Sequence, residues 1–241
     1  MEFRRFKSDQ LVDFQVFGER RSGTNFLSAL LAETFELDET FSYGWKHGVP
    51  VMPCIQSSSL IAVIVRNPLD WVLSMHARPF ASPAMTDLSF SEFIRTPWQS
   101  NYRPGVLGRV KFGLRGFPVA RNTPLQYDRH PIEGRCFSNV FELRTIKMKA
   151  HIEFLERDAN VAVVRYEDLA ADAAGFLKAI SKTFDLPIKS NATLRVGRVG
   201  PKTGSKRLTP ADISSEDMCF MNDQLEQTFE MRFSYDEVFN R

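Results

Sequence analysis

Residues 13–26 of the chain read DFQVFGERRSGTNF. The first five have the apolar and aromatic character of a short β-strand, and Gly18 ends the run. After Gly23, apolar side chains recur at the spacing of a helix at Phe26, Leu27, Leu30, Leu31 and Phe35. The segment therefore predicts a strand over 13–17, a loop with two glycines, and a helix over 23–35.

A loop between a strand and a helix directs backbone N–H groups and the positive end of the helix dipole at one point, which suits an anion such as phosphate. Arg21 adds positive charge, and Ser22, Thr24 and Asn25 add side-chain donors. The spacing GxxxxG is that of a P-loop, but a P-loop continues with Lys and then Ser or Thr. Here Thr24 follows Gly23 directly. Alone, the segment predicts either an anion-binding loop or a structural turn that caps a helix.

A second strand is predicted over residues 60–65, LIAVIV, a continuous apolar run typical of a strand buried on both faces of a parallel sheet. Pro68 suits the first turn of a following helix. In a nucleotide triphosphatase such a strand would end in an Asp that helps to hold Mg²⁺, but this one ends in Arg66. An Arg at that end points to the crevice where ligands bind, and Ser74, eight residues later, is placed to share its phosphate. The alternative is a surface Arg at a helix start.

The rest of the chain alternates between helical patterns and apolar runs. Helices are predicted over 90–94, 139–155, 170–184 and 214–229, the second of them amphipathic, and a buried strand over 161–164. We therefore expect an α/β fold, with a mostly parallel central sheet flanked by helices. The whole chain, 1–241, fits one domain, with an irregular insertion at about 78–135.

Composition limits the partners. A net charge of +2 does not demand a nucleic acid polymer, so an anion site must come from local clusters of Lys and Arg. We expect a cytoplasmic protein, because no signal peptide or membrane-spanning run is seen and the three cysteines form no disulfide or metal pattern. No pair of histidines has metal-ligand spacing, so no catalytic metal is predicted.

Together these segments resemble the sulfotransferase family that uses 3′-phosphoadenosine 5′-phosphosulfate (PAPS). The family's 5′ loop, Lys-Ser-Gly-Thr-Thr-Trp, is similar to Arg21, Ser22, Gly23, Thr24, Asn25 and Phe26. Arg66 and Ser74 match its 3′-phosphate pair, and Tyr166, in a Tyr-Glu-Asp segment, matches a Tyr near the adenine. The resemblance implies a P-loop NTPase-like sulfotransferase fold.

The family's late Arg-Lys-Gly-x-x-Gly segment is similar to Arg195, Val196, Gly197, Arg198, Val199 and Gly200. Val196 stands where the family has Lys, so Arg198 or Lys202 is expected to supply that charge. Arg21 stands where the family has Lys in the 5′ loop. It keeps the positive charge, but its N–H donors lie in a planar fork, unlike those of the compact Lys ammonium.

Residues 45–50, WKHGVP, resemble the family's Lys-Thr-His-x-Pro segment. Sulfuryl transfer needs a base for the acceptor's proton and positive charge near the leaving phosphate oxygen. His47 suits the first role and Lys46 or Arg21 the second. Adjacent residues of a strand face opposite sides, so Lys46 and His47 both serve only if the strand has ended, which Gly48 allows. Glu19 is the other candidate for the base. A further alternative is that His47 is an ordinary loop residue.

The sequence thus predicts a transferase that moves a sulfuryl group from PAPS to an acceptor hydroxyl or amine, without metal, and releases adenosine 3′,5′-bisphosphate. The expected donor-binding residues are Arg20, Arg21, Ser22, Gly23, Thr24, Asn25, Phe26, Arg66, Ser74, Tyr166, Arg195, Gly197, Arg198, Gly200 and Lys202.

The acceptor is expected to be a small molecule or a carbohydrate. Aromatic residues of the insertion suit a phenol, lipid or steroid-like alcohol, whereas its Lys and Arg residues suit an anion or a sugar. The alternatives are a P-loop kinase or hydrolase, with Asp168 as the acid for Mg²⁺, and a non-catalytic nucleotide-binding scaffold on the same fold. The sequence predicts no oligomeric state.

Overall fold

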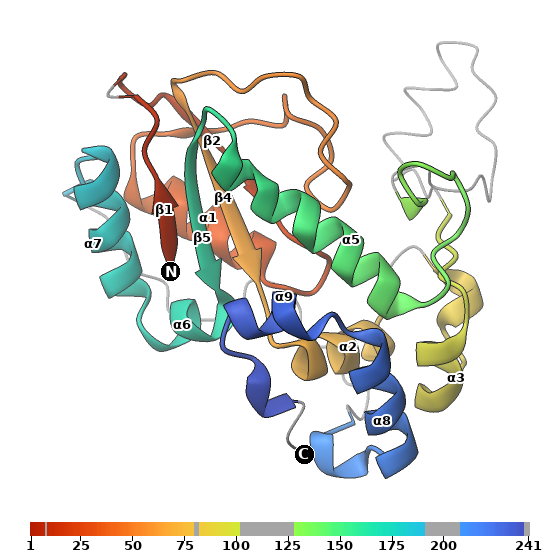
Figure 1. Ribbon diagram of the computed structural model, residues 1–241. Helices are drawn as coiled ribbons and strands as arrows, with labels where there is room; N and C mark the ends of the chain where they lie inside the picture. The colour runs from red at the N-terminus through yellow and green to blue at the C-terminus, as the bar shows by residue number, and fades with distance from the viewer. Residues whose placement is uncertain (8, 80–81, 102–127, 191–207, 239–241) are drawn as a thin grey trace, which may run out of the picture.

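The computed structural model describes residues 1–7, 9–79, 82–101, 128–190 and 208–238 (Figure 1). Among them, five strands form one sheet in the order β1-β5-β4-β2-β3. Their bounds are β1 Glu2–Arg4, β2 Asp13–Phe17, β3 Asp38–Glu39, β4 Ser59–Val65 and β5 Asn160–Arg165. Neighbouring strands are parallel except that β1 is antiparallel to β5. The predicted α/β class with a mostly parallel sheet is confirmed.

The central strand β4 is buried along its whole length. Leu60, Ala62 and Ile64 face one apolar core, whereas Ile61, Val63 and Val65 face another. This two-sided burial explains why the strand is a continuous apolar run instead of an alternating one.

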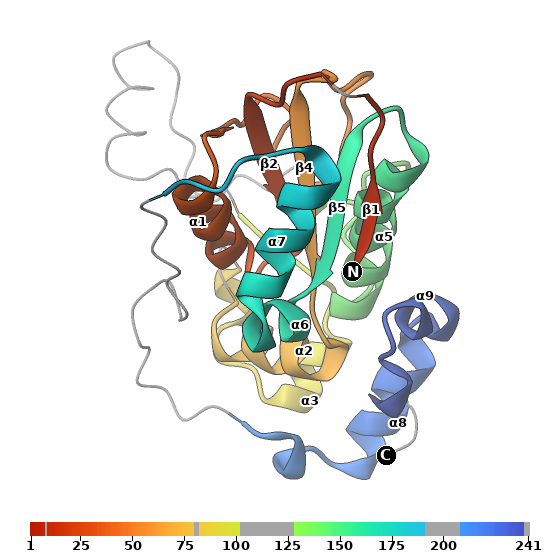
Figure 2. The ribbon, with the colours of Figure 1, turned by 90° about the vertical axis from the view of Figure 1, so that its left-hand side faces the viewer.

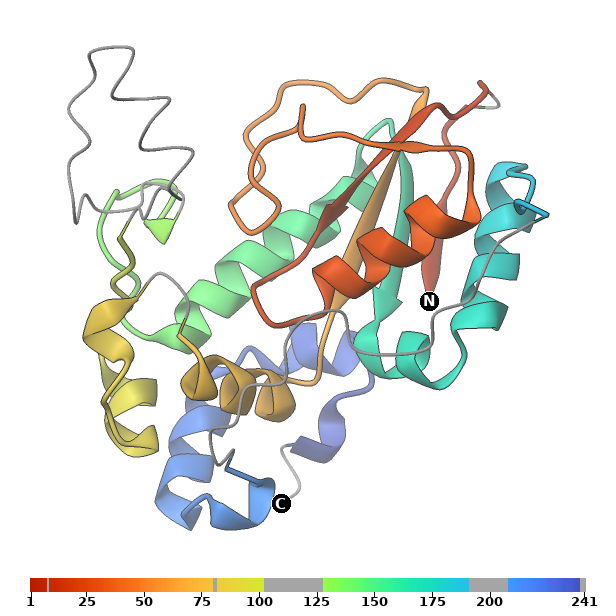
Figure 3. The same cartoon turned by 180° about the vertical axis from the view of Figure 1, so that it is seen from behind.

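Helices cover both faces of the sheet. On one face lie α1 (Thr24–Thr34), α6 (Tyr166–Ala171) and α7 (Ala173–Phe184), as Figures 2 and 3 show from two sides. On the other lie α5 (Val140–Ile152) and α9 (Gln227–Arg232). A third core, next to the carboxyl ends of the strands, joins α2 (Pro68–Ala77), α3 (Phe90–Arg95) and α8 (Ser215–Gln224) to α5.

Short 3₁₀ turns complete the described elements, at Pro83–Met85, Glu153–Glu156, Pro210–Asp212 and Asp236–Val238. In the described part of the chain no helix has both the length and the apolar character needed to cross a membrane.

Three predicted helices are wrong in detail. The helix over 170–184 is two helices, because Asp172 leaves the helical conformation (φ −143°, ψ 72°) and its carboxylate caps α7 by accepting from the backbone N–H of Gly175. The helix over 214–229 is likewise divided into α8 and α9, with Leu225 extended. The α-helix over 139–155 ends at Ile152 and continues as a 3₁₀ turn. The short helix predicted near residues 90–94 is confirmed as α3.

Candidate anion-binding site

Two glycines shape residues 18–25, called the anion loop from here on, at the carboxyl edge of the sheet. A Cβ added to Gly18 would lie 2.6 Å from the carbonyl oxygen of Ile64 in β4. Gly23 has a φ of 101°, and a Cβ there would lie 2.6 Å from the ring of Tyr166, which follows β5. Glycine is therefore required at both positions, and the loop packs closely against the end of β4 and the start of α6.

The loop ends at the start of α1, where the N-cap residue is a glycine. Gly23 precedes α1 and provides no side-chain cap, whereas Asn67 and Asn139 cap α2 and α5. The hydroxyl of Ser22 is buried, and within the described residues it has no hydrogen-bond partner. A buried hydroxyl without a partner is costly, and the first N–H groups of a helix attract negative charge. The geometry therefore suits an anion held by Ser22 and the start of α1.

Arg21 of this loop lies together with Arg66 and Ser74, and all three were predicted to bind the donor. Arg21, in the left-handed conformation (φ 68°), donates from Nε to the hydroxyl of Ser74 in α2, at 3.0 Å. Arg66, at the end of β4, donates from Nη1 to the carbonyl oxygen of Arg21, at 2.9 Å. The guanidinium of Arg66 lies over the ring of Tyr166, 4.7 Å from its centroid. The loop, the end of β4, α2 and the start of α6 thus meet at one positively charged region.

The predicted catalytic segment also meets the loop. Lys46 and His47 lie in a turn, in which the N–H of Gly48 donates to the carbonyl oxygen of Trp45 at 2.8 Å. Because this is no extended strand, both side chains reach the loop. Lys46 Nζ donates to Asn25 Oδ1 at 2.6 Å, and His47 Nδ1 lies 2.7 Å from the carbonyl oxygen of Gly18.

The contact with Gly18 defines the state of His47. A carbonyl oxygen only accepts, so Nδ1 carries the proton and Nε2 keeps its lone pair. Burial holds the pKa of His47 well below its ordinary value, the bond to Gly18 opposes this, and the nearby charges of Arg20, Lys46 and Lys147 lower it further. His47 is therefore a neutral imidazole at pH 7 that can accept a proton at Nε2.

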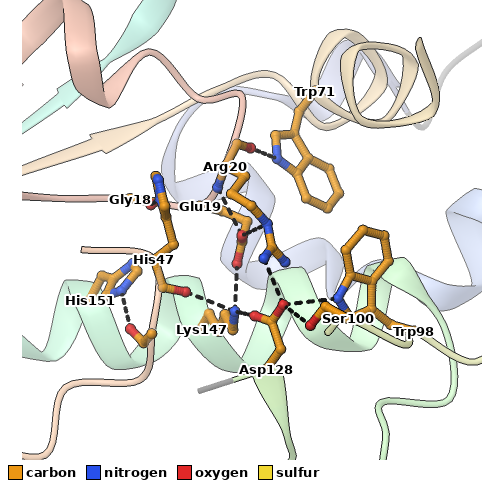
Figure 4. A network of polar contacts seen from close by, with 11 residues as sticks. Gly18, Glu19, Arg20, His47, Trp71, Trp98, Ser100, Asp128, Lys147 and His151 are labelled. Atoms are coloured by element: carbon orange, nitrogen blue, oxygen red, sulfur yellow. Dashed lines mark hydrogen bonds and ion pairs between the residues drawn. The ribbon is translucent and has the colours of Figure 1, made fainter. Parts of the chain in front are cut away.

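Glu19 and Arg20 lie inside the protein, in a buried charge cluster with Asp128 and Lys147 (Figure 4). Arg20 Nη1 donates to Asp128 Oδ2 at 2.6 Å, and Lys147 Nζ forms ion pairs with Asp128 and with Glu19 Oε2, the latter at 3.3 Å. The guanidinium of Arg20 also lies against the ring of Trp98. The geometry thus lends no support to Glu19 as a base or to Arg20 as a donor ligand.

Three basic residues that the sequence did not assign to the candidate site lie on α5 and contact it. Arg144 Nη2 donates to the carbonyl oxygen of Arg66, Lys147 Nζ to that of His47 and His151 Nε2 to that of Gly48, at 2.8, 2.7 and 2.8 Å. All three basic side chains are buried, although the charged residues of an amphipathic helix ordinarily lie on its solvent-facing side. Their spacing of three and four residues, within the apolar stripe of α5, was the available signal.

The remaining predicted residues are placed as follows. Thr24 is buried, and Phe26 is partly buried against the core under α1. Arg195, Gly197, Arg198, Gly200 and Lys202, with residues 102–127 of the predicted insertion, lie outside the described residues. Among the residues that are described, no cluster of three or more His, Cys, Asp or Glu side chains could hold a metal ion.

Comparisons of the chain with protein-family models, curated proteins and solved structures gave no match.

Proposed function

We propose that the protein is a PAPS-dependent sulfotransferase with a P-loop-like nucleotide site. The observation that carries the proposal is the anion loop. There the buried hydroxyl of Ser22, which has no hydrogen-bond partner among the described residues, lies beside the start of α1, whose N-cap Gly23 provides no side-chain cap. Arg66 at the end of β4, where a triphosphatase has a metal-binding acid, favours a phosphate ligand over a bound cation.

In this proposal the two phosphate groups of the donor bind on either side of Arg21. Ser22, the backbone of residues 23–25 and Lys46 hold the 5′-phosphosulfate, and Arg66 and Ser74 hold the 3′-phosphate. Tyr166, already stacked on Arg66, is placed to contact the adenosine.

The transfer forms a bond between sulfur and the acceptor atom and breaks the bond between sulfur and the bridging oxygen of the 5′-phosphate, which keeps the electron pair. His47 Nε2 takes the acceptor's proton, which its neutral state permits. Lys46 and Arg21 provide positive charge near the departing phosphate. Lys46 is oriented by Asn25, at 2.6 Å.

The P-loop kinase or hydrolase is less well supported. Asp168, its only strand-end acid in the sequence analysis, lies in α6 with Oδ1 3.9 Å from Nη1 of Arg165. Magnesium-dependent ATP hydrolysis that Asp168→Ala abolishes would favour this alternative.

Binding of adenosine 3′,5′-bisphosphate and of ATP, measured by calorimetry, tests the donor site. We expect much tighter binding of the bisphosphate, and a loss of about 10- to 100-fold in its affinity in Arg66→Ala, since a charged hydrogen bond contributes about 1.5–3 kcal/mol. Arg5→Ala is the matched control, because Arg5 is exposed and donates to the carbonyl oxygen of Thr183. Equal affinity for the two nucleotides would overturn the proposal.

A screen of phenols, alcohols, amines and sugars with labelled PAPS tests the transfer itself. His47→Ala should lose most of the activity, whereas a loss confined to Glu19→Ala would make Glu19 the base. If neither change slows transfer, the catalytic assignment is wrong. Tight bisphosphate binding without any transfer would indicate the non-catalytic scaffold.

A further inference from the structure

The buried charge cluster has no part in the proposed chemistry, yet two of its members, Glu19 and Arg20, belong to the anion loop. Glu19, Arg20, Asp128 and Lys147 are 0%, 3%, 2% and 0% exposed. Two acids and two bases make the cluster formally neutral. Burying such ions costs free energy that their attraction seldom exceeds by much, so apolar side chains would serve stability as well. The location of the cluster therefore points to a role beyond stability.

Lys147 connects the cluster to the proposed base. Its ammonium donates to the carbonyl oxygen of His47 at 2.7 Å, lies 3.3 Å from Glu19 Oε2, and forms an ion pair with Asp128. Two of its N–H donors form the hydrogen bonds to His47 and Asp128, and the carboxylate of Glu19 is an ion-pair partner without a hydrogen bond. Because the side chain of Lys147 is fully buried, it is not exposed to a substrate and acts through its neighbours.

His47 is consequently fixed at two points from different elements. Lys147, on α5, holds its backbone carbonyl, and Gly18, at the start of the anion loop, holds its imidazole Nδ1 (Figure 4). Glu19 and Arg20 follow Gly18 directly and belong to the same cluster. The cluster thus fixes the positions of the anion loop and of His47 relative to each other.

We propose that Lys147, held by Asp128 and Glu19, is a positioning residue that fixes His47 and its Nε2 relative to the anion loop. This inference rests on the proposed function, in which His47 is the base. It adds that the base depends on charges that never touch the substrate.

The cluster also sets the charge around His47. The cations facing it are Arg20, Lys46 and Lys147, and the carboxylates of Glu19 and Asp128 partly neutralise two of them. On α5, His151 lies beside Gly48 and is neutral at pH 7. Lys147→Met removes a cation and should raise the pKa of His47. Asp128→Asn removes an anion and should lower it further.

The test is a nitrogen-15 NMR titration of the His47 imidazole, without nucleotide, in the wild type and both variants. We expect a wild-type ring protonated at Nδ1, a raised pKa and mixed tautomers in Lys147→Met, and a lowered pKa in Asp128→Asn. Lys149→Met, on the same helix with an exposed side chain paired to Glu226, is the control and should match the wild type.

Kinetics provide the second measurement. In Lys147→Met, kcat for sulfate transfer should fall about 100-fold, because small displacements of a reacting group have effects of this size. The acid limb of the pH profile should move to higher pH, while the affinity for adenosine 3′,5′-bisphosphate should change less than about threefold.

The outcomes separate the two proposals. An unchanged tautomer and pKa of His47 in folded Lys147→Met would overturn the positioning role, whatever the activity. If Lys147→Met does not fold, the same titration of Asp128→Asn replaces it. An unchanged pKa of His47 in Asp128→Asn would likewise overturn the positioning role. The expected NMR changes without any transfer by the wild type would overturn the proposed function and leave the coupling of Lys147 to His47 intact.

Discussion

His151 should make the stability of the protein depend on pH. Its imidazole is completely buried in α5, and Nε2 donates to the carbonyl oxygen of Gly48 at 2.8 Å. Nδ1 is buried and lacks a hydrogen-bond partner within the described chain. Burial lowers the pKa of His151 to about 4, the charge of Lys147 adds to this, and the bond to Gly48 opposes it. The folded protein therefore resists protonation of this ring.

The sign and size of the effect follow from proton linkage. In the unfolded chain the pKa of a histidine is about 6.5. As the pH falls from 6.5 to about 4, the unfolded chain binds a proton that the folded protein does not. The free energy of unfolding should therefore decrease by up to about 1.4 kcal/mol per pH unit, or about 3 kcal/mol across this window.

The assay is urea unfolding of the wild type and of His151→Gln at pH 7, 5.5 and 4, followed by tryptophan fluorescence. Glutamine places its amide nitrogen where Nε2 was, so it can donate to Gly48 but cannot titrate. The difference in unfolding free energy between the two proteins should shift by about 3 kcal/mol in favour of the variant between pH 7 and 4. His47, with its own lowered pKa, contributes equally to both and cancels.

Lys149→Gln, a change on the same helix at an exposed side chain paired to Glu226, should show no such shift. A wild-type to His151→Gln difference that is the same at pH 7 and pH 4 would refute the reasoning.

Two further changes test the packing of the site. Gly23→Ala should lower the free energy of unfolding by about 1–3 kcal/mol and abolish bisphosphate binding, because the added Cβ would lie 2.6 Å from the ring of Tyr166. Thermal denaturation measures the first effect and calorimetry the second. In the control, Gly134→Ala, the φ is also positive but the added Cβ has open space, so only stability should be lost. Arg144→Met should cost about 3–5 kcal/mol in urea unfolding, because it leaves the buried carboxylate of Glu230 unpaired. Adding Glu230→Leu should recover most of this loss, and a double variant as unstable as the single one would contradict the explanation.

Local patterns predicted the core of the fold. The apolar run at 60–65 and the strand, loop and helix of residues 13–35 correspond to β4, β2 and α1, because each depends on burial of neighbouring side chains. The edge strands β1 and β3 were not predicted, since they have three and two residues, none of them buried. Segments so short carry no periodic signal.

The site was predictable only where its residues are close in the chain or aligned at strand ends. Arg21, Arg66 and Ser74 lie together because they follow or flank parallel strands with their carboxyl ends at one edge. Asp128 and Lys147 were missed, because a charged residue in an insertion or on a helix is ordinarily solvated. Only the three-dimensional structure shows that Lys147 is buried with Glu19 and Asp128 around it.

The buried charge cluster also has a consequence for the order of folding. Arg20 and Asp128 are 108 residues apart in the sequence. At about 5–20 residues per second, the ribosome therefore adds Asp128 roughly 5 to 20 s after it adds Arg20. Until Asp128 and Lys147 have been added, Glu19 and Arg20 remain hydrated, and the nascent chain cannot bury these two charged side chains. We therefore expect the anion loop, though made among the first residues, to reach its final form only after α5 has left the ribosome.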